Sequence, residues 1–415
     1  MVEIKPFKGY RYDVEDLSKV ICPPYDVISR DHQKKLLALS PHNFVRLILG
    51  DDPYVEECKR DLSRIARLFE EWIDEGVLRK EERDSIYVYS QTFDAEGEPR
   101  RRTGIIPLVT LEEFREKSIY PHEKVISKHV EDRYALMEAT RANSGMVFGI
   151  YADPAREVDR LVDEILHDKP ISSCAIDEVL HELWKIDDEA LIAHLRREME
   201  AKKVYIADGH HRYTTALRYR NAHPEREEVK YVMMTLVNMY NEGLVIFPTH
   251  RLVKRDRHDV KRILKGIEDN FHLEPTTPDQ MMDRIHGKKF SYGFYCDGDY
   301  YVIRLMEGRG LDTILPGPSE ALRQLDVTVL HEMILKPIFQ IDTEDEDIQE
   351  KITYMKSLPA AMTKLSTDEY SFGFFLNAVN MEEIVRVAGD HEVMPQKSTF
   401  FHPKVYSGLV VHRLE

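Results

Sequence analysis

Apolar residues recur along the first part of the chain with two different periods. Over Val55–Val77 they return every three or four positions, which predicts a long amphipathic helix. In Ile86–Phe93 and Gly104–Val109, β-branched and aromatic residues lie on both sides of the polar stretch Asp94–Pro99, a pattern typical of a hairpin. We expect further strands over Met146–Tyr151, Val179–Ile186, Lys203–Ala207 and Tyr231–Met239, and helices over Ala155–His167, Asp188–Lys202 and from about His211 to Ala222.

The second part of the chain mixes helical and strand patterns in the same way. We expect helices over Val260–Phe271, Pro278–His286 and Ala321–Leu335, a hairpin of Phe290–Tyr295 and Tyr300–Leu305, and a strand over Tyr370–Leu376. Strands interspersed with helices and hairpins favour an α+β or mixed α/β fold over a doubly wound sheet. A chain of 415 residues exceeds one typical domain. We predict an N-terminal α+β region (1–100), a core (101–252) and a C-terminal α+β domain (253–415).

Composition and charge narrow the class of protein. The chain is 42% hydrophobic and 32% charged, as expected for a globular protein, and its net charge of -16 argues against nucleic acid as a partner. The four cysteines lie far apart without a CxxC pair, which favours reduced thiols over disulfides or a zinc site: Cys22, Cys58, Cys174 and Cys296. No segment has the length and apolarity of a signal peptide or a membrane span, so we expect a soluble, cytoplasmic protein without membrane contact.

The segment Ala207–Tyr213 (ADGHHRY) concentrates polar groups where a predicted strand meets a predicted helix. Gly209 allows a tight turn, and the first turn of the helix offers free N–H groups and the positive end of the helix dipole. Such a helix start favours a bound anion, and Arg212 adds a planar fork of donors suited to phosphate. Asp208 could hold a histidine tautomer or a magnesium ion, or could instead be an ordinary N-cap.

The adjacent histidines His210 and His211 are candidates for hydrogen bonding or proton transfer near neutral pH. They could equally cap the helix. Neighbouring residues on a helix point about 100° apart, so the pair is a poor metal site and we predict no resident metal ion.

Other polar clusters could line a site. Each has a structural alternative. Tyr25 and Asp26 could lie in a rigid loop that only shapes the chain entry, Asn143 could be a helix C-cap, and His250 and Arg251 could lie in a solvated turn. Lys397 precedes two hydroxyl residues but lacks the glycines of a P-loop. The candidates are Tyr25, Asp26, Arg141, Asn143, His250, Arg251 and Lys397.

Several motifs occur together in a pattern that resembles the DUF1015 family, which is named for having no known function. These are ADGHHRY, the opening CPPYDVIS (Cys22–Ser29), Tyr120–Glu123 and the ending Met394–Gly408. The resemblance spans nearly the whole chain.

The DGHHR element also resembles the nucleotide-binding turn of the ParB/sulfiredoxin superfamily, which includes CTP-binding partition proteins, ATP-using sulfiredoxin and an ADP-dependent free serine kinase. This resemblance implies a ParB/sulfiredoxin-like core within 101–252, with an insertion between Ile150 and Lys203. It implies phosphate-binding roles for Gly209, His210 and Arg212 and catalytic roles for Asp208 and His211.

The kinase also uses a glutamate that follows a histidine as the base on the substrate hydroxyl. The matching residues are His122 and Glu123, which could otherwise be part of a charged loop. We therefore predict a phosphotransferase that uses ATP or ADP with Mg²⁺ and acts on a small hydroxyl-bearing metabolite, with serine as the first candidate. The alternatives are a nucleotide-binding regulator without turnover and a phosphohydrolase that uses the same pocket.

Overall fold

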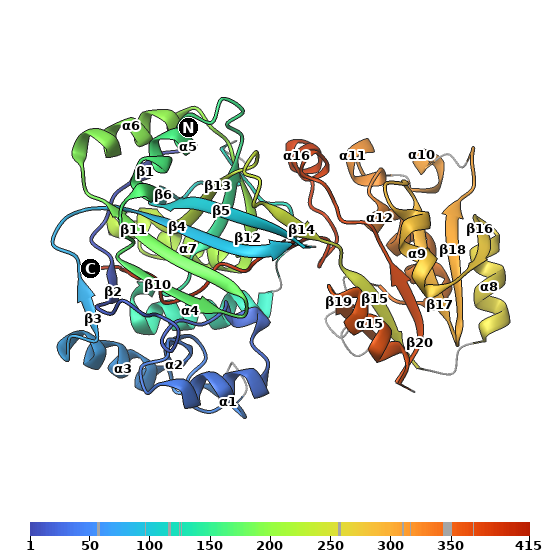
Figure 1. Ribbon diagram of the computed structural model, residues 1–415, viewed down its shortest axis with the longest axis horizontal. Helices are drawn as coiled ribbons and strands as arrows, with labels where there is room; N and C mark the ends of the chain where they lie inside the picture. Colours follow the sequence, from blue (N-terminus) through green and yellow to red (C-terminus); the bar gives the residue numbers. More distant parts are fainter. Residues whose placement is uncertain are drawn as a thin grey trace. The chain divides into compact units, whose positions relative to one another are not determined.

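The computed structural model describes residues 1–55, 59–95, 97–114, 118–123, 125, 127–255, 259–308, 311–315, 317–342, 351–367 and 369–415; Cys58 lies outside them. The chain forms two compact units (Figure 1). The first unit comprises Met1–Pro121, Val125–Val245 and Pro403–Glu415, and the second comprises His122–Lys124 and Ile246–His402. The C-terminal segment therefore returns to the unit in which the chain begins.

This division differs from the three predicted domains. Position 100 lies within β5 (Glu98–Ile106), which pairs along its whole length with β4 (Ile86–Ala95), so the chain is not divided there. The change from the first unit to the second falls between Val245 and Ile246, and position 253 lies inside β15 (His250–Lys254).

The first unit is built on a ten-stranded sheet with both parallel and antiparallel pairs. Its main path runs through β10 (Ser172–Ile176), β11 (Val179–Ile186), β4, β5, β13 (Tyr231–Asn238), β9 (Val147–Tyr151), β12 (Val204–Asp208) and β7 (Ile119–Tyr120). β13 is parallel to β9 and antiparallel to β5, which confirms the mixed α/β class. Off this path lie β6 (Leu108–Thr110), which pairs with β13, and β1 (Ile4–Lys5), which pairs with β6.

The β4–β5 hairpin is longer than its sequence pattern suggests. Both strands continue through the expected turn until Ala95 pairs with Glu98, and Gly97 next to the turn has a φ of +85°. The return strand ends at Ile106, because Pro107 has no N–H to donate, and β6 follows it. The predicted turn Asp94–Pro99 is therefore mostly strand.

Helices and short ladders complete the first unit. α4 packs against α3 and α7, and apolar residues from the helices and the sheet form one large core. The predicted helix over Val55–Val77 begins only at Leu62 in the described residues, where Asp61 caps it. The helices are α1 (Arg30–Leu39), α2 (Val45–Ile48), α3 (Leu62–Asp74), α4 (Ser127–Thr140), α5 (Glu157–Asp163), α6 (Glu189–Glu200) and α7 (His210–Ala222), with the short helices η1 (Tyr25–Val27), η3 (Ile165–His167) and η4 (Glu228–Lys230). Two ladders pair β2 (Tyr10–Tyr12) with β3 (Leu78–Lys80) and β8 (Ala142–Asn143) with β22 (His412–Arg413).

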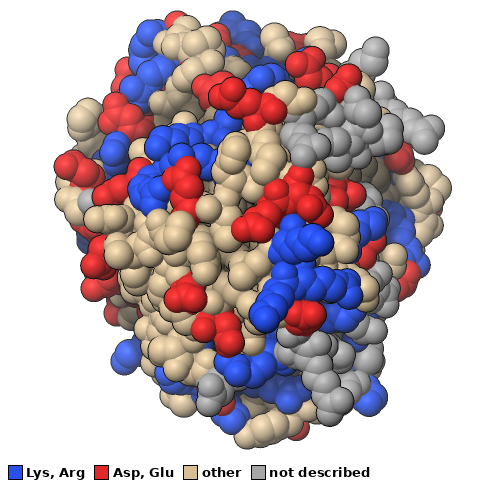
Figure 2. All heavy atoms as spheres, turned by 90° about the vertical axis from the view of Figure 1, so that its right-hand side faces the viewer, with Lys and Arg blue, Asp and Glu red and all other residues tan. Residues whose placement is uncertain are grey.

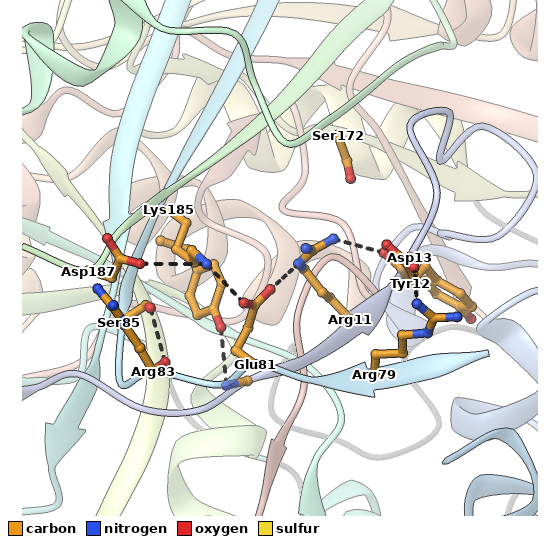
Figure 3. Close-up of polar contacts among 12 residues, drawn as sticks. Arg11, Tyr12, Asp13, Arg79, Glu81, Arg83, Ser85, Ser172, Lys185 and Asp187 are labelled. Atoms are coloured by element: carbon orange, nitrogen blue, oxygen red, sulfur yellow. Dashed lines mark hydrogen bonds and ion pairs between the residues drawn. The ribbon is translucent and has the colours of Figure 1, made fainter. Parts of the chain in front are cut away.

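A polar network links the β2–β3 ladder to the large sheet (Figure 3). The carboxylate of Glu81 accepts from Arg11 of β2 and, at 3.0 Å, from Lys185 of β11. Asp13 and Arg79 form a further pair, but their side chains are 51% and 66% exposed. Exposed pairs contribute little to stability, so we expect the contacts of Glu81, which is 10% exposed, to stabilise this link more than the Asp13–Arg79 pair does.

The second unit contains a six-stranded antiparallel sheet. The strand order is β16 (Phe271–Thr276), β18 (Asp299–Leu305), β17 (Ser291–Cys296), β20 (Tyr370–Phe375), β15 and β19 (Ile352–Met355). The predicted β17–β18 hairpin and the strand over Tyr370–Leu376 are confirmed. The remaining elements are α8 (Val260–Glu268), α9 (Pro278–Ile285), α10 (Leu311–Ile314), α11 (Glu320–Arg323), α12 (Asp326–Leu330), the π-helix η5 (His331–Leu335), α13 (Lys336–Phe339), α15 (Leu358–Leu365), α16 (Met381–Gly389) and β21 (Phe400–His402), with β14 (Val245–Phe247) at the change of unit.

Two predicted helices of this unit are wrong in extent. The helix expected to reach Phe271 ends at Glu268, because Phe271 pairs with Leu305 and begins β16. The helix expected over Ala321–Leu335 is split, since Leu325 is extended (ψ 131°) between α11 and α12.

Charged side chains of both signs lie next to one another on the face of the second unit shown in Figure 2. Among the described residues, none of the helices combines the length and apolarity that crossing a membrane would require.

Candidate functional site

The segment Ala207–Tyr213 forms the turn that the sequence predicts. β12 ends at Asp208, and α7 begins at His210. Between them Gly209 is left-handed, with a φ of +88°, a conformation that glycine adopts without strain. The register of β12 against β9 shifts between Ile206 and Asp208, so a β-bulge lies just before the turn and changes the direction of the strand at Asp208.

Arg212 lies against two glycines. A Cβ at Gly209 would come within 3.1 Å of Arg212 Nε, and a Cβ at Gly145 within 3.3 Å of Nη1. Nη1 donates to the carbonyl of Met146, whereas the buried Nε has no hydrogen-bond partner among the described atoms. The guanidinium is thus held by the hydrogen bond of Nη1, while Nε remains available as a donor.

Asp208 is the counter-charge of this turn. Its Oδ2 accepts from Lys404 at 2.6 Å, its Oδ1 accepts from the N–H of Gly209 at 2.7 Å, and Arg212 Nη2 lies 3.9 Å away. Burial alone would raise the pKa of Asp208, but Lys404, Arg212 and the nearby His210 outweigh it and lower this pKa well below its ordinary value. The carboxylate is therefore ionised and already engaged at both oxygens, which leaves it poorly suited to binding magnesium. It caps no helix, because the N-cap position belongs to Gly209.

The two histidines lie in different surroundings. His210 is buried, whereas His211 is partly exposed and its ring meets that of His129 edge-on, with centroids 5.3 Å apart. The rings of Tyr25 and His129 have centroids 6.5 Å apart, and the guanidinium of Arg133 lies over the Tyr25 ring at 4.1 Å.

Arg133 is fixed by a buried ion cluster. Asp132 accepts from Arg133 Nε at 2.8 Å and from Arg60, and these side chains are at most 6% exposed. Burial opposes ionisation of Asp132, but the two guanidinium groups lower the pKa of this carboxyl nonetheless.

One pocket of the first unit collects several predicted residues. Tyr25, Asn143 and Arg212 line it together, although they lie far apart in sequence. Asp26 and Arg141 are exposed and are not part of its wall. The lining comprises Tyr25, Ile48, Arg133, Leu136, Met137, Ala142, Asn143, Ser144, Gly145, Arg212, Thr215, Val232 and Ser407.

The end of α4 corrects one predicted alternative. Arg141, with a φ of +48°, is the left-handed residue after α4, so Asn143 is not the cap. Asn143 lies in β8, where its Oδ1 accepts from the N–H of Met233 at 3.2 Å. The backbone N–H of Arg141 donates to the carbonyl of Met137, and its carbonyl accepts from the N–H of Leu414.

The other predicted residues belong to the second unit, and two of them contact the backbone of Lys397. The N–H of Lys397 donates to Glu123 Oε1 at 3.1 Å, and its carbonyl accepts from Arg251 Nη2 at 3.2 Å. His122 is fully buried and hydrogen-bonds Thr399 at 3.0 Å. His250 accepts from the N–H of Leu376 at 3.4 Å, and burial together with Arg251 lowers its pKa to about 4.

Sequence reasoning missed Lys404, Ser407, Gly145 and Arg133. Lys404 and Ser407 lie in the C-terminal block that the family resemblance includes, so that block was a usable signal. Gly145 and Arg133 belong to no motif. Among the described residues there is no group of three His, Cys, Asp or Glu side chains arranged to hold a metal ion.

Comparisons with known proteins give a family and distant structural likenesses. A family model described as "Protein of unknown function (DUF1015)" matches residues 4–328, and no curated protein matches the chain. A mutant free serine kinase in complex with AMP is 12% identical, with a TM-score of 0.40 over 72% of this chain and 86% of that one. A conserved hypothetical protein from Pyrococcus furiosus is 13% identical, with a TM-score of 0.39 over 74% and 95%. C-terminally truncated SbnI from Staphylococcus aureus is 11% identical, with a TM-score of 0.38 over 74% and 87%.

Proposed function

The chain belongs to the DUF1015 family of proteins of unknown function, and we propose that it is a nucleotide-dependent phosphotransferase that binds nucleotide phosphates at Asp208–Arg212. The observation that carries this proposal is the position of Arg212 between Gly145 and Gly209, with its buried Nε uncommitted among the described atoms. Side chains at the two glycines would crowd the guanidinium. A phosphate oxygen is the kind of acceptor that such a donor requires.

The start of α7 supports the same assignment. The helix has 13 residues, and its first N–H groups have no acceptor within the helix. These groups and the helix dipole favour an anion beside Arg212. The phosphates of ATP or ADP therefore fit the donors of this turn.

Asp208 has a positioning role in this proposal. Because it holds Lys404 and the N–H of Gly209, it fixes the turn and keeps a second cation close to the phosphates. Magnesium, when bound with the nucleotide, would neutralise phosphate charge. Its ligands would be phosphate oxygens rather than Asp208.

We assign the acceptor to a small hydroxyl-bearing metabolite, with serine as the first candidate, and the general base to Glu123. The hydroxyl oxygen forms a bond to the terminal phosphorus while the bond from that phosphorus to the bridging oxygen breaks. The hydroxyl proton passes to the Glu123 carboxylate, and the shortened nucleotide leaves. His211 is assigned to proton transfer near the phosphates.

The test uses the purified full chain with magnesium, serine and either ATP or ADP, and detects O-phosphoserine by mass spectrometry. Arg212→Ala should lower nucleotide affinity, measured by calorimetry, at least about tenfold, because a charge-assisted donor is lost. Arg218→Ala is the matched control, since Arg218 lies on the same helix but is exposed and pairs with Glu131. Glu123→Gln should leave nucleotide affinity unchanged and abolish product.

Three other results would each contradict the proposal. Nucleotide binding without product from any hydroxyl acceptor would favour the regulator, and phosphate release without transfer would favour the hydrolase. Equal nucleotide affinity in Arg212→Ala and Arg218→Ala would remove the assignment of the turn.

A further inference from the structure

Arg251 of the second unit is a buried cation without a carboxylate partner. Arg251 is 1% exposed, and the charged or titratable side chains that act on it among the described residues are tyrosines, not carboxylates. Two of its nitrogens donate to backbone carbonyls, those of Thr249 and Lys397, whereas Nε has no hydrogen-bond partner among the described atoms. Burial lowers the pKa of Arg251 to about 10, with only Tyr354 and Tyr292 opposing it. Burying an unbalanced charge is costly, which is why such a group usually has an anion close by.

Arg251 lines a pocket whose other charges largely cancel. Lys289 pairs with Glu383, while Lys288 is exposed at the rim and Asp326 accepts from the N–H of Phe290 at 2.8 Å. The positive charges of the two lysines balance the negative charges of Glu383 and Asp326, so Arg251 contributes the one positive charge in excess among these side chains. The polar wall is completed by Thr249, Asn377, Asn380 and Ser398.

The backbone of Lys397 links Arg251 to Glu123, because its N–H donates to Glu123 and its carbonyl accepts from Arg251. Lys397 also has a φ of +58°, an unfavourable conformation for a residue with a Cβ. Strained residues persist where the surroundings hold them, and they cluster at binding sites. Arg251 and Glu123 are thus bound to the same residue of the chain.

We propose that Arg251 binds the carboxylate of the acceptor, so that the acceptor is a small hydroxy acid or hydroxy amino acid. The assignment of this carboxylate to a phosphoryl acceptor rests on the proposed phosphotransferase function, whereas the carboxylate site itself does not. A carboxylate matches the single excess charge and the planar guanidinium fork. A phosphate dianion would instead place a second negative charge near Glu383 and Asp326.

The first experiment measures binding by calorimetry to the full chain without nucleotide. L-serine, 3-hydroxypropionate and ethanolamine form a matched set, since serine and ethanolamine share the amine and hydroxyl and differ in the carboxylate. Serine and 3-hydroxypropionate should bind at least about tenfold more tightly than ethanolamine, because a buried donor is left unsatisfied without the carboxylate. Inorganic phosphate is the competing probe.

Variants distinguish a specific role of the Arg251 guanidinium from a general effect of positive charge. Arg251→Lys keeps the charge but loses the fork, and should weaken serine binding about tenfold; Arg251→Met should abolish it. Arg255→Met is the control, because Arg255 follows the same strand but is half exposed beside Asp297. Circular dichroism checks folding, and if Arg251→Met does not fold, Arg251→Lys and the ligand series still decide.

Equal affinity for serine and ethanolamine, unchanged serine binding in Arg251→Lys, or tight phosphate binding without carboxylate binding would overturn the site. With nucleotide present, product from serine but not from ethanolamine supports the acceptor class. Product from both would overturn that class while leaving the phosphotransferase standing. Arg251-dependent serine binding without product from any acceptor would leave the carboxylate site standing while the proposed function fails.

Discussion

The ammonium group of Lys404 donates to Asp208 across 196 positions of sequence, at 2.6 Å. The two side chains are 14% and 17% exposed, so the pair is largely shielded from water. The C-terminal segment also accepts from Arg102 at Pro403 and from Gln91 at Lys404. It therefore supplies both the cation that pairs with Asp208 and a backbone partner for the buried Arg102.

Loss of this pair should destabilise the first unit. We expect Lys404→Met to cost roughly 3 kcal/mol, because it removes the nearest cation from a buried carboxylate, and Asp208→Asn added to it should recover much of that loss. Urea unfolding followed by tryptophan fluorescence measures this, since the two tryptophans, Trp72 and Trp184, both lie in the first unit. If Lys404→Met were as stable as the wild type, the pair would have no energetic role.

Substitutions of glycine should separate backbone strain from crowding of Arg212. Gly209→Ala and Gly97→Ala both place a side chain at a φ near +90° and should each cost about 1 kcal/mol of stability. Of these two variants, only Gly209→Ala should also weaken nucleotide binding, since a Cβ at Gly97 would have no neighbour within 4 Å among the described atoms. Gly145→Ala should weaken nucleotide binding without this strain. Calorimetry checks all three, and equal affinity in Gly209→Ala and Gly97→Ala would refute the prediction.

The Asp132 cluster should contribute far more than an exposed pair. Asp132→Asn leaves Arg60 and Arg133 buried without their counter-charge, and should cost about 3–5 kcal/mol. Asp13→Asn removes the partner of Arg79 shown in Figure 3 and should change stability by less than about 0.5 kcal/mol. Tryptophan-detected unfolding compares the two variants, and similar losses would mean that burial does not set the cost.

The first unit should lose stability as the pH falls below 6.5. Burial, assisted by Arg102, lowers the pKa of His181 to about 3, and burial, assisted by Lys5, lowers that of His412 to about 4. The unfolded chain titrates these groups near their ordinary pKa of about 6.5 and binds more protons below it, so the contribution is complete above pH 6.5 and lost on acidification.

At pH 5 the loss should be about 2 kcal/mol for each histidine. Tryptophan-detected unfolding at pH 7, 6 and 5 measures it, and this window lies above the carboxylate titrations. His181→Gln should roughly halve the slope. A flat profile between pH 6.5 and 5 would contradict the burial of uncharged imidazoles.

Local sequence was sufficient for the elements around the turn. The apolar run Lys203–Ala207 followed by Asp208-Gly209 predicted a strand, a tight turn and a helix to Ala222, and all three are present. These depend on neighbours in sequence: side-chain alternation in the strand, the freedom of Gly209 and the periodicity of the helix. The same local information failed at Leu325 and at Phe271, where pairing and burial in the second unit end the predicted helices.

The sequence by itself determined that the chain folds as a mixed α/β protein with a phosphate-suited turn at Asp208–Arg212. Only the tertiary structure decided that Lys404 neutralises Asp208, that Gly145 borders Arg212 and that Arg251 and Glu123 both bind the backbone of Lys397. The physical reason is that turns and helices follow from the conformational preferences of adjacent residues. The partner of a buried charge is set by which distant segments pack together.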